Sequence, residues 1–198
     1  MNIIFVDLDH TLLDTFQETP EGLRAALTSA RNRGLRQGCL DHMARCLEHA
    51  ERAVISSFRL ERVLVRPGAE LALQAFRELG EVHVYTGADP IYARCALEAV
   101  GLLKHVNKVF TTRQENDLSF IANKPWILID DWLAVEKLTK LGCYVAEPHL
   151  LRVDPLHFGD PEPVPLTNYI PEACAMLIAQ HLRLSAGQQY TPQLLFRD

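Results

Sequence analysis

Side chains that could carry out chemistry follow three short apolar stretches of the 198-residue chain. They are four acids and a threonine followed by glycine: Asp7, Asp9, Asp130, Asp131, Thr86 and Gly87. Carboxylates that converge repel one another and raise each other's pKa unless a cation joins them. Oxygen donors of this kind favour Mg²⁺ over zinc or copper. Acids around such an ion, beside a hydroxyl and free backbone N–H groups, are typical of a phosphate-binding site.

These side chains can meet only if the chain builds a sheet that brings the three stretches together. Apolar runs alternate with helical patterns along most of the sequence. The expected strands cover residues 2–6, 82–85, 106–111, 126–129 and 143–146, and the expected helices cover residues 69–79, 90–100, 133–141 and 171–184. This alternation predicts an α/β fold with a Rossmann-like parallel sheet and helices on both faces. The carboxyl ends of such strands share one edge, where ligands bind.

A long insertion follows the first expected strand. Helical patterns cover residues 20–33 and 40–60 before Pro67-Gly68 interrupts the chain, and no clear strand lies between them. We therefore expect a small α-helical cap. The predicted division is a catalytic core of residues 1–14 and 63–170, a cap of residues 15–62, and a C-terminal helix and tail of residues 171–198.

Composition limits the classes of partner. With a net charge of −5, the chain lacks a broad basic surface, and no nucleic-acid binding surface is evident. We expect no membrane partner, because no apolar run is long enough for a transmembrane helix and no signal peptide is recognisable. The five cysteines are widely spaced without a CxxC pair, which favours a reduced, cytoplasmic protein.

One group of metal-type residues lies within the insertion. Cys39, His42, Cys46 and His49 fall on one face of its second expected helix. Four ligands from a single straight helix cannot enclose a tetrahedral zinc ion. We therefore expect these residues to serve ordinary packing or contact with a partner.

The three motifs resemble those of a known family. Asp7-Leu8-Asp9-His10-Thr11-Leu12 resembles the DxDxT signature of the haloacid dehalogenase (HAD) superfamily. Thr86 resembles the threonine of its second motif, and Asp130-Asp131 resembles its acidic fourth motif. The motifs occur in the family's order, each at an expected strand end. The resemblance spans roughly residues 3–147.

The resemblance implies a role for each of these residues. Asp7 would be the nucleophile that forms an aspartyl-phosphate, and Asp9 would act as general acid and then as general base. Mg²⁺ would be held by Asp7, the backbone carbonyl of Asp9, and Asp130, while Thr86 and Gly87 would bind phosphoryl oxygens. Three further residues are expected around this set: His10, Thr11 and Asp131.

The acid at Asp9 separates two reactions within the superfamily. A carbon–halogen bond needs no proton on its leaving group, whereas an alkoxide does. The sequence therefore resembles a phosphatase or phosphotransferase rather than a dehalogenase.

The third motif of the family, a Lys or Arg near the phosphoryl oxygens, has two candidates. Lys124 is followed by Pro125, as is common at this motif, and is preferred. It lies only six residues before Asp130, however, and so belongs to the start of the strand. Arg113, which follows the expected strand at residues 109–112, is the alternative.

The expected substrate is a small phosphate ester, a phosphorylated metabolite or a nucleotide, because a cap must close around it and exclude water. The segment 64–69, with Arg66-Pro67-Gly68, is similar to one in C-terminal-domain protein phosphatases and in some nucleotidases. A protein phosphatase of that type is an alternative, although such enzymes usually lack a cap at this point.

Two non-hydrolytic interpretations are also open. A non-catalytic protein that binds a phospho-ligand or acts as a scaffold on the same fold is one of them. A response-regulator receiver is the other, but its phosphorylated Asp ends a middle strand, whereas Asp7 ends the first.

Overall fold

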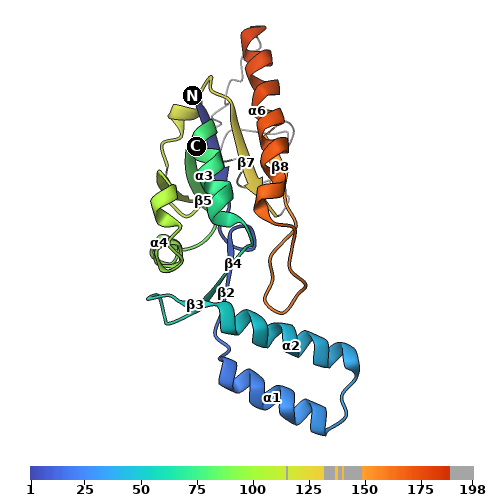
Figure 1. The fold of residues 1–198 in the computed structure, drawn as a ribbon. Helices are drawn as coiled ribbons and strands as arrows, with labels where there is room; N and C mark the ends of the chain where they lie inside the picture. Colours follow the sequence, from blue (N-terminus) through green and yellow to red (C-terminus); the bar gives the residue numbers. More distant parts are fainter. Residues whose placement is uncertain (115, 132–136, 138–139, 141–148, 188–198) are drawn as a thin grey trace.

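The computed structural model describes residues 1–114, 116–131, 137, 140 and 149–187. The core of the protein is a five-stranded sheet with the order β6-β5-β1-β7-β8, in which all neighbouring strands are parallel (Figure 1). The strands are β1 (Asn2–Val6), β5 (Gly80–Thr86), β6 (Lys108–Thr111), β7 (Trp126–Asp130) and β8 (Leu150–Arg152). The predicted α/β fold is confirmed. The strand expected at residues 143–146 lies outside the described residues, as does most of the helix expected at residues 133–141.

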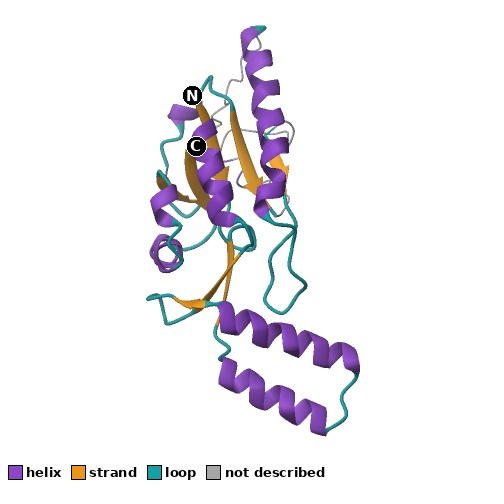
Figure 2. Ribbon diagram, in the orientation of Figure 1, coloured by secondary structure: helices purple, strands orange, loops and turns teal. Residues whose placement is uncertain are grey.

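β1 lies in the middle of the sheet because it is apolar on both faces. Ile3, Ile4, Phe5 and Val6 are all completely buried, as expected of a strand between two parallel neighbours. Ile4 and Val6 face the larger apolar cluster, which is covered by the helices α3 (Ala69–Leu79), α4 (Pro90–Ala99) and α6 (Ile170–Ser185) (Figure 2). Ile3 and Phe5 face a second cluster with several aromatic rings and the 3-10 helix η2 (Ser119–Ile121).

The start of α4 is defined by local chemistry. The Asp89 side chain accepts hydrogen bonds from the N–H groups of Ile91 and Tyr92, and Pro90 occupies the first helical position. Tyr92 is thereby held in the first turn of the helix. Two further 3-10 helices, η1 (Leu103–His105) and η3 (Leu166–Tyr169), precede β6 and α6.

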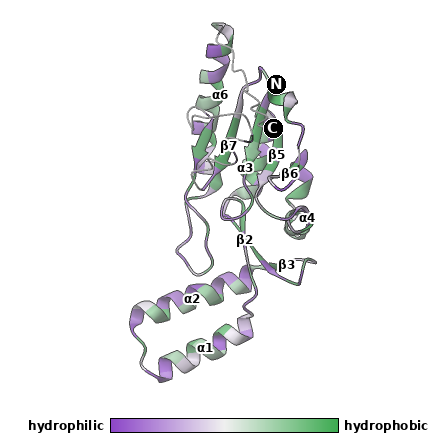
Figure 3. Cartoon of the chain, turned by 180° about the vertical axis from the view of Figure 1, so that it is seen from behind, coloured by the Kyte–Doolittle hydropathy of each residue, from purple (hydrophilic) through white to green (hydrophobic). Residues whose placement is uncertain are grey.

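The insertion after β1 contains a helical pair, α1 (Pro20–Asn32) and α2 (Gln37–Arg52), which lies beyond one end of the sheet (Figure 1). These helices carry alternating hydrophilic and hydrophobic residues, whereas the central strands are hydrophobic throughout (Figure 3). The small insert expected after the first strand is therefore present. None of the helices described combines the length and apolar character needed to cross a bilayer.

The insertion also contains strands, which corrects the expectation of none. An antiparallel sheet of order β2-β4-β3 is formed by β2 (Leu13–Phe16), β3 (Val54–Ile55) and β4 (Arg62–Val65). Strands of two to four residues are too short for a period-2 pattern to be recognised in the sequence. The second helix accordingly ends at Arg52 instead of continuing to residue 60.

Residues 154–165, which we call the strap, run from β8 toward η3 and lie against the insertion. Arg45 of α2 donates from Nε to the Gly159 carbonyl at 3.0 Å, and the Gly159 N–H donates to His49 Nδ1 at 3.1 Å. The ring of Phe158 stacks on that of Phe16 with centroids 3.9 Å apart. The strap therefore links the insertion to the core.

The Cys and His residues of α2 take part in this contact. The backbone of Gly159 approaches Cys46 and His42 so closely that a Cβ atom there would lie 2.5 Å from Cys46 Sγ. Arg52 forms an ion pair with Glu162 a little farther along the strap. Cys39, by contrast, is exposed.

Candidate active site

The carboxyl ends of β1 and β7 bring the first and fourth acidic motifs together. Val6 is paired with Ile129, and the Asp7 N–H donates to the Ile129 carbonyl at 2.8 Å. Asp7 and Asp130, the next residues along, therefore lie side by side and close to Asp131. One carboxylate oxygen from each of these three acids lies within 4.8 Å of the other two.

Lys137 reaches into this acidic cluster. Its Nζ lies 2.6 Å from Asp7 Oδ1 and 2.9 Å from Asp130 Oδ2, and the Lys137 side chain is only 16% exposed. This residue was not predicted from the sequence. The only signal was its place in the helix expected after Asp130, about two turns beyond the acid.

The electrostatics follow from burial. Burial raises the pKa of Asp7 to about 7, an effect that Lys137 opposes and the neighbouring Asp130 reinforces. Burial lowers the pKa of Lys137, but the attraction of Asp7 and Asp130 outweighs it, so the net shift of this amine is upward. The amine is therefore charged at neutral pH, donates a charge-assisted hydrogen bond to Asp130 Oδ2 and forms an ion pair with Asp7.

Asp9 is held by a tyrosine from another element. The Tyr92 hydroxyl donates to Asp9 Oδ1 at 2.5 Å and lies 3.1 Å from Thr15 Oγ1. Burial raises the pKa of Asp9, and the hydrogen bond from Tyr92 opposes that shift. Burial and the nearby Asp9 also raise the pKa of Tyr92, so the phenol keeps its proton. Tyr92 was not anticipated, because an aromatic residue in an apolar helical pattern indicates core packing.

Thr86 and Gly87 lie at the end of β5, the other neighbour of β1. Thr86 is buried, and its Oγ1 accepts a hydrogen bond from the Ala88 N–H at 3.1 Å. The Gly87 carbonyl accepts from Arg113 Nε at 3.0 Å, which places the exposed Arg113 beside this turn. Three strand ends thus present acids, a hydroxyl and a glycine turn along one edge of the sheet.

No protein-family model and no curated protein matches the sequence. Among solved structures, a haloacid dehalogenase-like family hydrolase from Xanthomonas campestris is similar over 92% of this chain and 98% of its own, with 11% sequence identity and a TM-score of 0.52. At this identity, the likeness is one of fold. The chain has the fold of the HAD-like hydrolases.

Other solved structures with lower scores are also similar. A HAD-superfamily hydrolase from Ehrlichia chaffeensis matches 87% of this chain and 96% of its own at 9% identity, with a TM-score of 0.47. The fission yeast RNA polymerase II CTD phosphatase Fcp1 matches 93% of this chain at 17% identity, with a TM-score of 0.44. This chain covers 53% of that structure.

The structure places Lys124, the preferred candidate for the third motif, away from the acidic cluster. Lys124 precedes β7, and its Nζ lies 5.9 Å from the centre of the Phe120 ring. Asp130 is at the opposite end of the same strand, which at about 3.3 Å per residue puts the backbones of the two residues roughly 20 Å apart. Within the residues that the structure describes, Lys137 is the cation that pairs with Asp7 and Asp130, and Arg113 lies beside the Gly87 turn.

Thr11 connects the two acidic motifs. Its Oγ1 donates to Asp131 Oδ1 at 3.2 Å and accepts from the Asp131 N–H at 3.0 Å. The neighbouring His10 has a backbone φ of 62° and a ring that turns toward Asp14, 3.5 Å from Nδ1 to Oδ1. The structure therefore places Thr11 and Asp131 within the acidic site and directs the His10 ring elsewhere.

Arg66 binds the backbone of the loop that contains His10 and Thr11. Its buried guanidinium donates to the carbonyls of Thr11 at 2.5 Å, His10 at 3.2 Å and Val164 at 2.9 Å, and to that of Asp154. A buried Arg that satisfies carbonyl groups in this way fixes the loop and the strap together.

The donors fit a hard divalent cation. Asp7, Asp130 and Asp131 each offer an oxygen atom within 4.8 Å of the other two, and the buried Asp7 Oδ1 accepts no hydrogen bond within the described structure. Oxygen-only donors with this charge suit Mg²⁺. The residues present therefore fit the expected ion.

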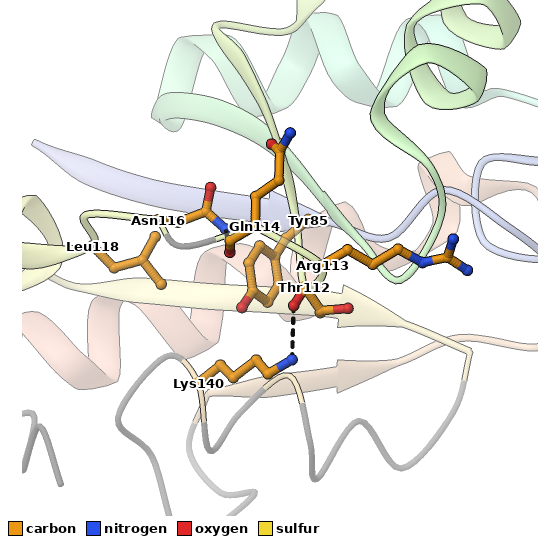
Figure 4. Close-up of a pocket in the computed structure, with 7 residues that line it drawn as sticks. All are labelled: Tyr85, Thr112, Arg113, Gln114, Asn116, Leu118 and Lys140. Carbon is orange, nitrogen blue, oxygen red and sulfur yellow. Dashed lines mark hydrogen bonds between the residues drawn. The ribbon is translucent and has the colours of Figure 1, made fainter. Parts of the chain in front are cut away.

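A pocket of about 350 Å³ opens beside the ends of β5 and β6 (Figure 4). Its lining includes Tyr85, Thr112, Arg113 and Lys140, and Lys140 Nζ donates to the Thr112 carbonyl at 2.8 Å. Thr112 in turn donates from its N–H to the Thr86 carbonyl at 2.9 Å. The pocket is thus adjacent to the glycine turn and carries two cationic side chains.

Proposed function

We propose that this protein is a Mg²⁺-dependent phosphatase that hydrolyses a phosphate monoester through an aspartyl-phosphate on Asp7. The observation that carries the proposal is the buried Asp7, paired with Lys137 beside Asp130 at the carboxyl edge of a HAD-like sheet. A buried carboxylate with a cation on one side and a raised pKa is poised for chemistry and is costly as a purely structural feature.

In the first step, a carboxylate oxygen of Asp7 attacks phosphorus and the bond from phosphorus to the ester oxygen breaks. The leaving oxygen takes a proton from Asp9. The raised pKa of Asp9 favours its protonated form, and the Tyr92 hydroxyl fixes the orientation of its carboxyl group.

In the second step, water attacks the phosphorus of the aspartyl-phosphate while Asp9, now ionised, accepts its proton. The acyl-phosphate bond breaks, phosphate leaves, and Asp7 and Asp9 return to their starting states. The same carboxyl group thus serves as acid and then as base.

Charge is handled by groups around the nucleophile. Asp7, Asp130 and the Asp9 carbonyl would hold Mg²⁺, with Asp131 in the same cluster. When bound, the ion neutralises phosphoryl charge as Asp7 approaches. Lys137 supplies a fixed positive charge, and the Thr86 hydroxyl with the N–H groups of its turn would receive phosphoryl oxygens.

The substrate class follows from the insertion. We propose that residues 15–62 act as a cap, that residues 1–14 and 63–170 form the catalytic core, and that residues 171–198 form a C-terminal extension of it. A helical pair beyond the reactive edge favours a small phosphorylated metabolite or nucleotide that can be enclosed.

The test uses p-nitrophenyl phosphate and then a panel of phosphorylated metabolites, each with and without Mg²⁺. Asp7→Asn should lower turnover by more than about 10³-fold. Asp9→Asn should instead accumulate a protein-bound phosphate that hydroxylamine releases, since an acyl phosphate forms but its hydrolysis lacks a base.

The matched control is Asp41→Asn, which changes an exposed acid on α2 that pairs with Gln37. Its turnover should equal that of the native protein, and circular dichroism should show all variants folded. Undiminished turnover in folded Asp7→Asn would exclude the mechanism.

A further inference from the structure

A second group of metal-ligating side chains lies outside the acidic cluster, where the strap passes the beginning of the insertion. His10 follows β1, Asp14 belongs to β2, and His157 belongs to the strap. One donor atom from each of these three residues lies within 4.8 Å of the other two. His10 and Asp14 lie four residues apart on one turn, and the fold brings His157 to them from the distant strap.

The carboxylate of Asp14 lies near the surface and is fixed by two hydrogen bonds. Its Oδ1 accepts a hydrogen bond from the Thr15 N–H at 2.8 Å, and its Oδ2 accepts one from the Phe158 N–H at 2.8 Å. The side chain is 12% exposed. Each carboxylate oxygen has a second lone pair, so these bonds orient the group without preventing it from binding a cation.

His10 is equally constrained. Its backbone N–H donates to the Leu13 carbonyl at 2.7 Å, and its carbonyl accepts from the Leu156 N–H at 2.7 Å. Its ring Nδ1 lies 3.1 Å from the Leu156 carbonyl. The same Nδ1 lies 3.5 Å from Asp14 Oδ1, so this nitrogen faces both the carbonyl and the carboxylate. With its proton on Nε2, the neutral ring presents the lone pair of Nδ1 toward Asp14, where a metal ion would bind it.

His157 completes the group, since its ring centroid lies 4.3 Å from that of His10. In a tetrahedral site with bonds of about 2.1 Å, donor atoms are about 3.4 Å apart, so the three donors need to approach by little more than about 1 Å. Rotation of the His157 side chain, whose neighbours on the strap include the anchored Phe158, can supply this movement.

The donor chemistry selects the ion. Two imidazoles and one carboxylate suit Zn²⁺ and related transition metals, whereas the all-carboxylate cluster at Asp7 suits Mg²⁺. We propose that His10, Asp14 and His157 form a binding site for a divalent transition metal of the zinc class, distinct from the magnesium site. Three protein ligands leave one tetrahedral position for water or another small donor.

A metal ion at this site would cross-link the strap to the turn that leads into β2. The unfolded chain does not present these ligands together, so metal binding adds directly to the stability of the folded state. The strap and the start of β2 would then be joined through the metal in addition to the Asp14 to Phe158 hydrogen bond.

The experiment titrates Co²⁺ into the full chain, freed of any histidine tag, in saturating Mg²⁺. Native protein should bind one Co²⁺ with visible absorption bands of a low-coordinate site, and Zn²⁺ should displace it. His157→Ala and His157→Gln should each weaken binding by more than about tenfold, because loss of a ligand costs at least as much as loss of its supporting partner. Zn²⁺ should raise the melting temperature of the native protein but not of these variants.

Two controls separate this site from other metal binding. Asp130→Asn, which disrupts the acidic cluster, should leave the Co²⁺ bands intact, and so should His181→Gln, which changes an exposed histidine of α6. Equal Co²⁺ affinity in native protein and in both His157 variants, or bands lost only in Asp130→Asn, would overturn the proposal. Both results are independent of whether the protein hydrolyses phosphate esters.

Discussion

At the scale of single residues, the acidic cluster is organised by a cation from the chain itself. Lys137 contacts both Asp7 and Asp130, and each partner alters the ionisation of the others. A buried carboxylate without such a partner would be protonated and unable to attack phosphorus. Lys137 therefore opposes the effect of burial on the pKa of Asp7 and favours the carboxylate form that the proposed mechanism requires.

Replacement of Lys137 by Met should lower turnover of p-nitrophenyl phosphate by roughly 10²–10³-fold, because a fixed positive charge at the reacting group is lost. Lys137→Arg should retain part of the activity. Lys104→Met provides the control, since Lys104 is exposed and its Nζ pairs with Glu70 at 2.9 Å. Steady-state kinetics in saturating Mg²⁺ measure all three variants, and equal loss in Lys137→Met and Lys104→Met would contradict this role.

At the scale of elements, the strap decides how the insertion is held. Its backbone contacts α2 through Arg45 and His49, and its Phe158 packs on Phe16 of β2. Gly159 makes this close approach possible, with φ at +84° and no space for a Cβ atom. The insertion is thereby fastened to the core at a point away from its own connections.

Gly159→Ala should destabilise the protein by more than about 3 kcal/mol, since it combines a left-handed backbone with a clash against Cys46. Gly34→Ala is the matched control. Gly34 also has a positive φ, of +66°, but a Cβ atom there would meet nothing within 4 Å, so only about 1 kcal/mol should be lost. Urea unfolding measures both, and similar losses would show that the strap contact is not tight.

At the scale of the whole molecule, buried histidines make stability depend on pH. Burial lowers the pKa of His49, His83 and His149. His149 stacks on Trp126 with ring centroids 4.0 Å apart, and its Nδ1 lies 2.8 Å from the Trp126 carbonyl. The unfolded chain therefore binds protons at these positions more readily than the folded one.

The free energy of unfolding should fall as the pH drops below about 6.5, the ordinary pKa of histidine. Above that pH, the stability that depends on these three histidines being neutral should be fully present. The raised pKa of Asp7 has the opposite effect on the free energy of unfolding, which it increases as the pH falls. This effect is the same in native protein and in every variant that retains Asp7. His149→Gln should therefore lose less stability than native protein between about pH 7.5 and pH 5.5. Urea titrations at both pH values test this, and parallel losses would contradict it.

The order of motifs along the chain was enough to predict much of the architecture. Apolar runs that end in Asp7, Thr86 and Asp130 predict parallel strands with a shared edge, because strands buried on both faces have a continuous apolar sequence. The insertion was also predictable from its helical spacing. Its strands were not, since two to four residues carry no recognisable period.

The partners of the acids depended on the tertiary structure. Lys137, Tyr92 and His157 lie in segments whose local pattern says nothing about which acid they approach. Lys124, next to a suggestive proline, lies at the far end of its strand. Local sequence determines which residues form a strand and which acids end it, because both follow from short-range periodicity. The side chains that meet those acids are decided by how helices, loops and the strap pack across long separations, which no local pattern encodes.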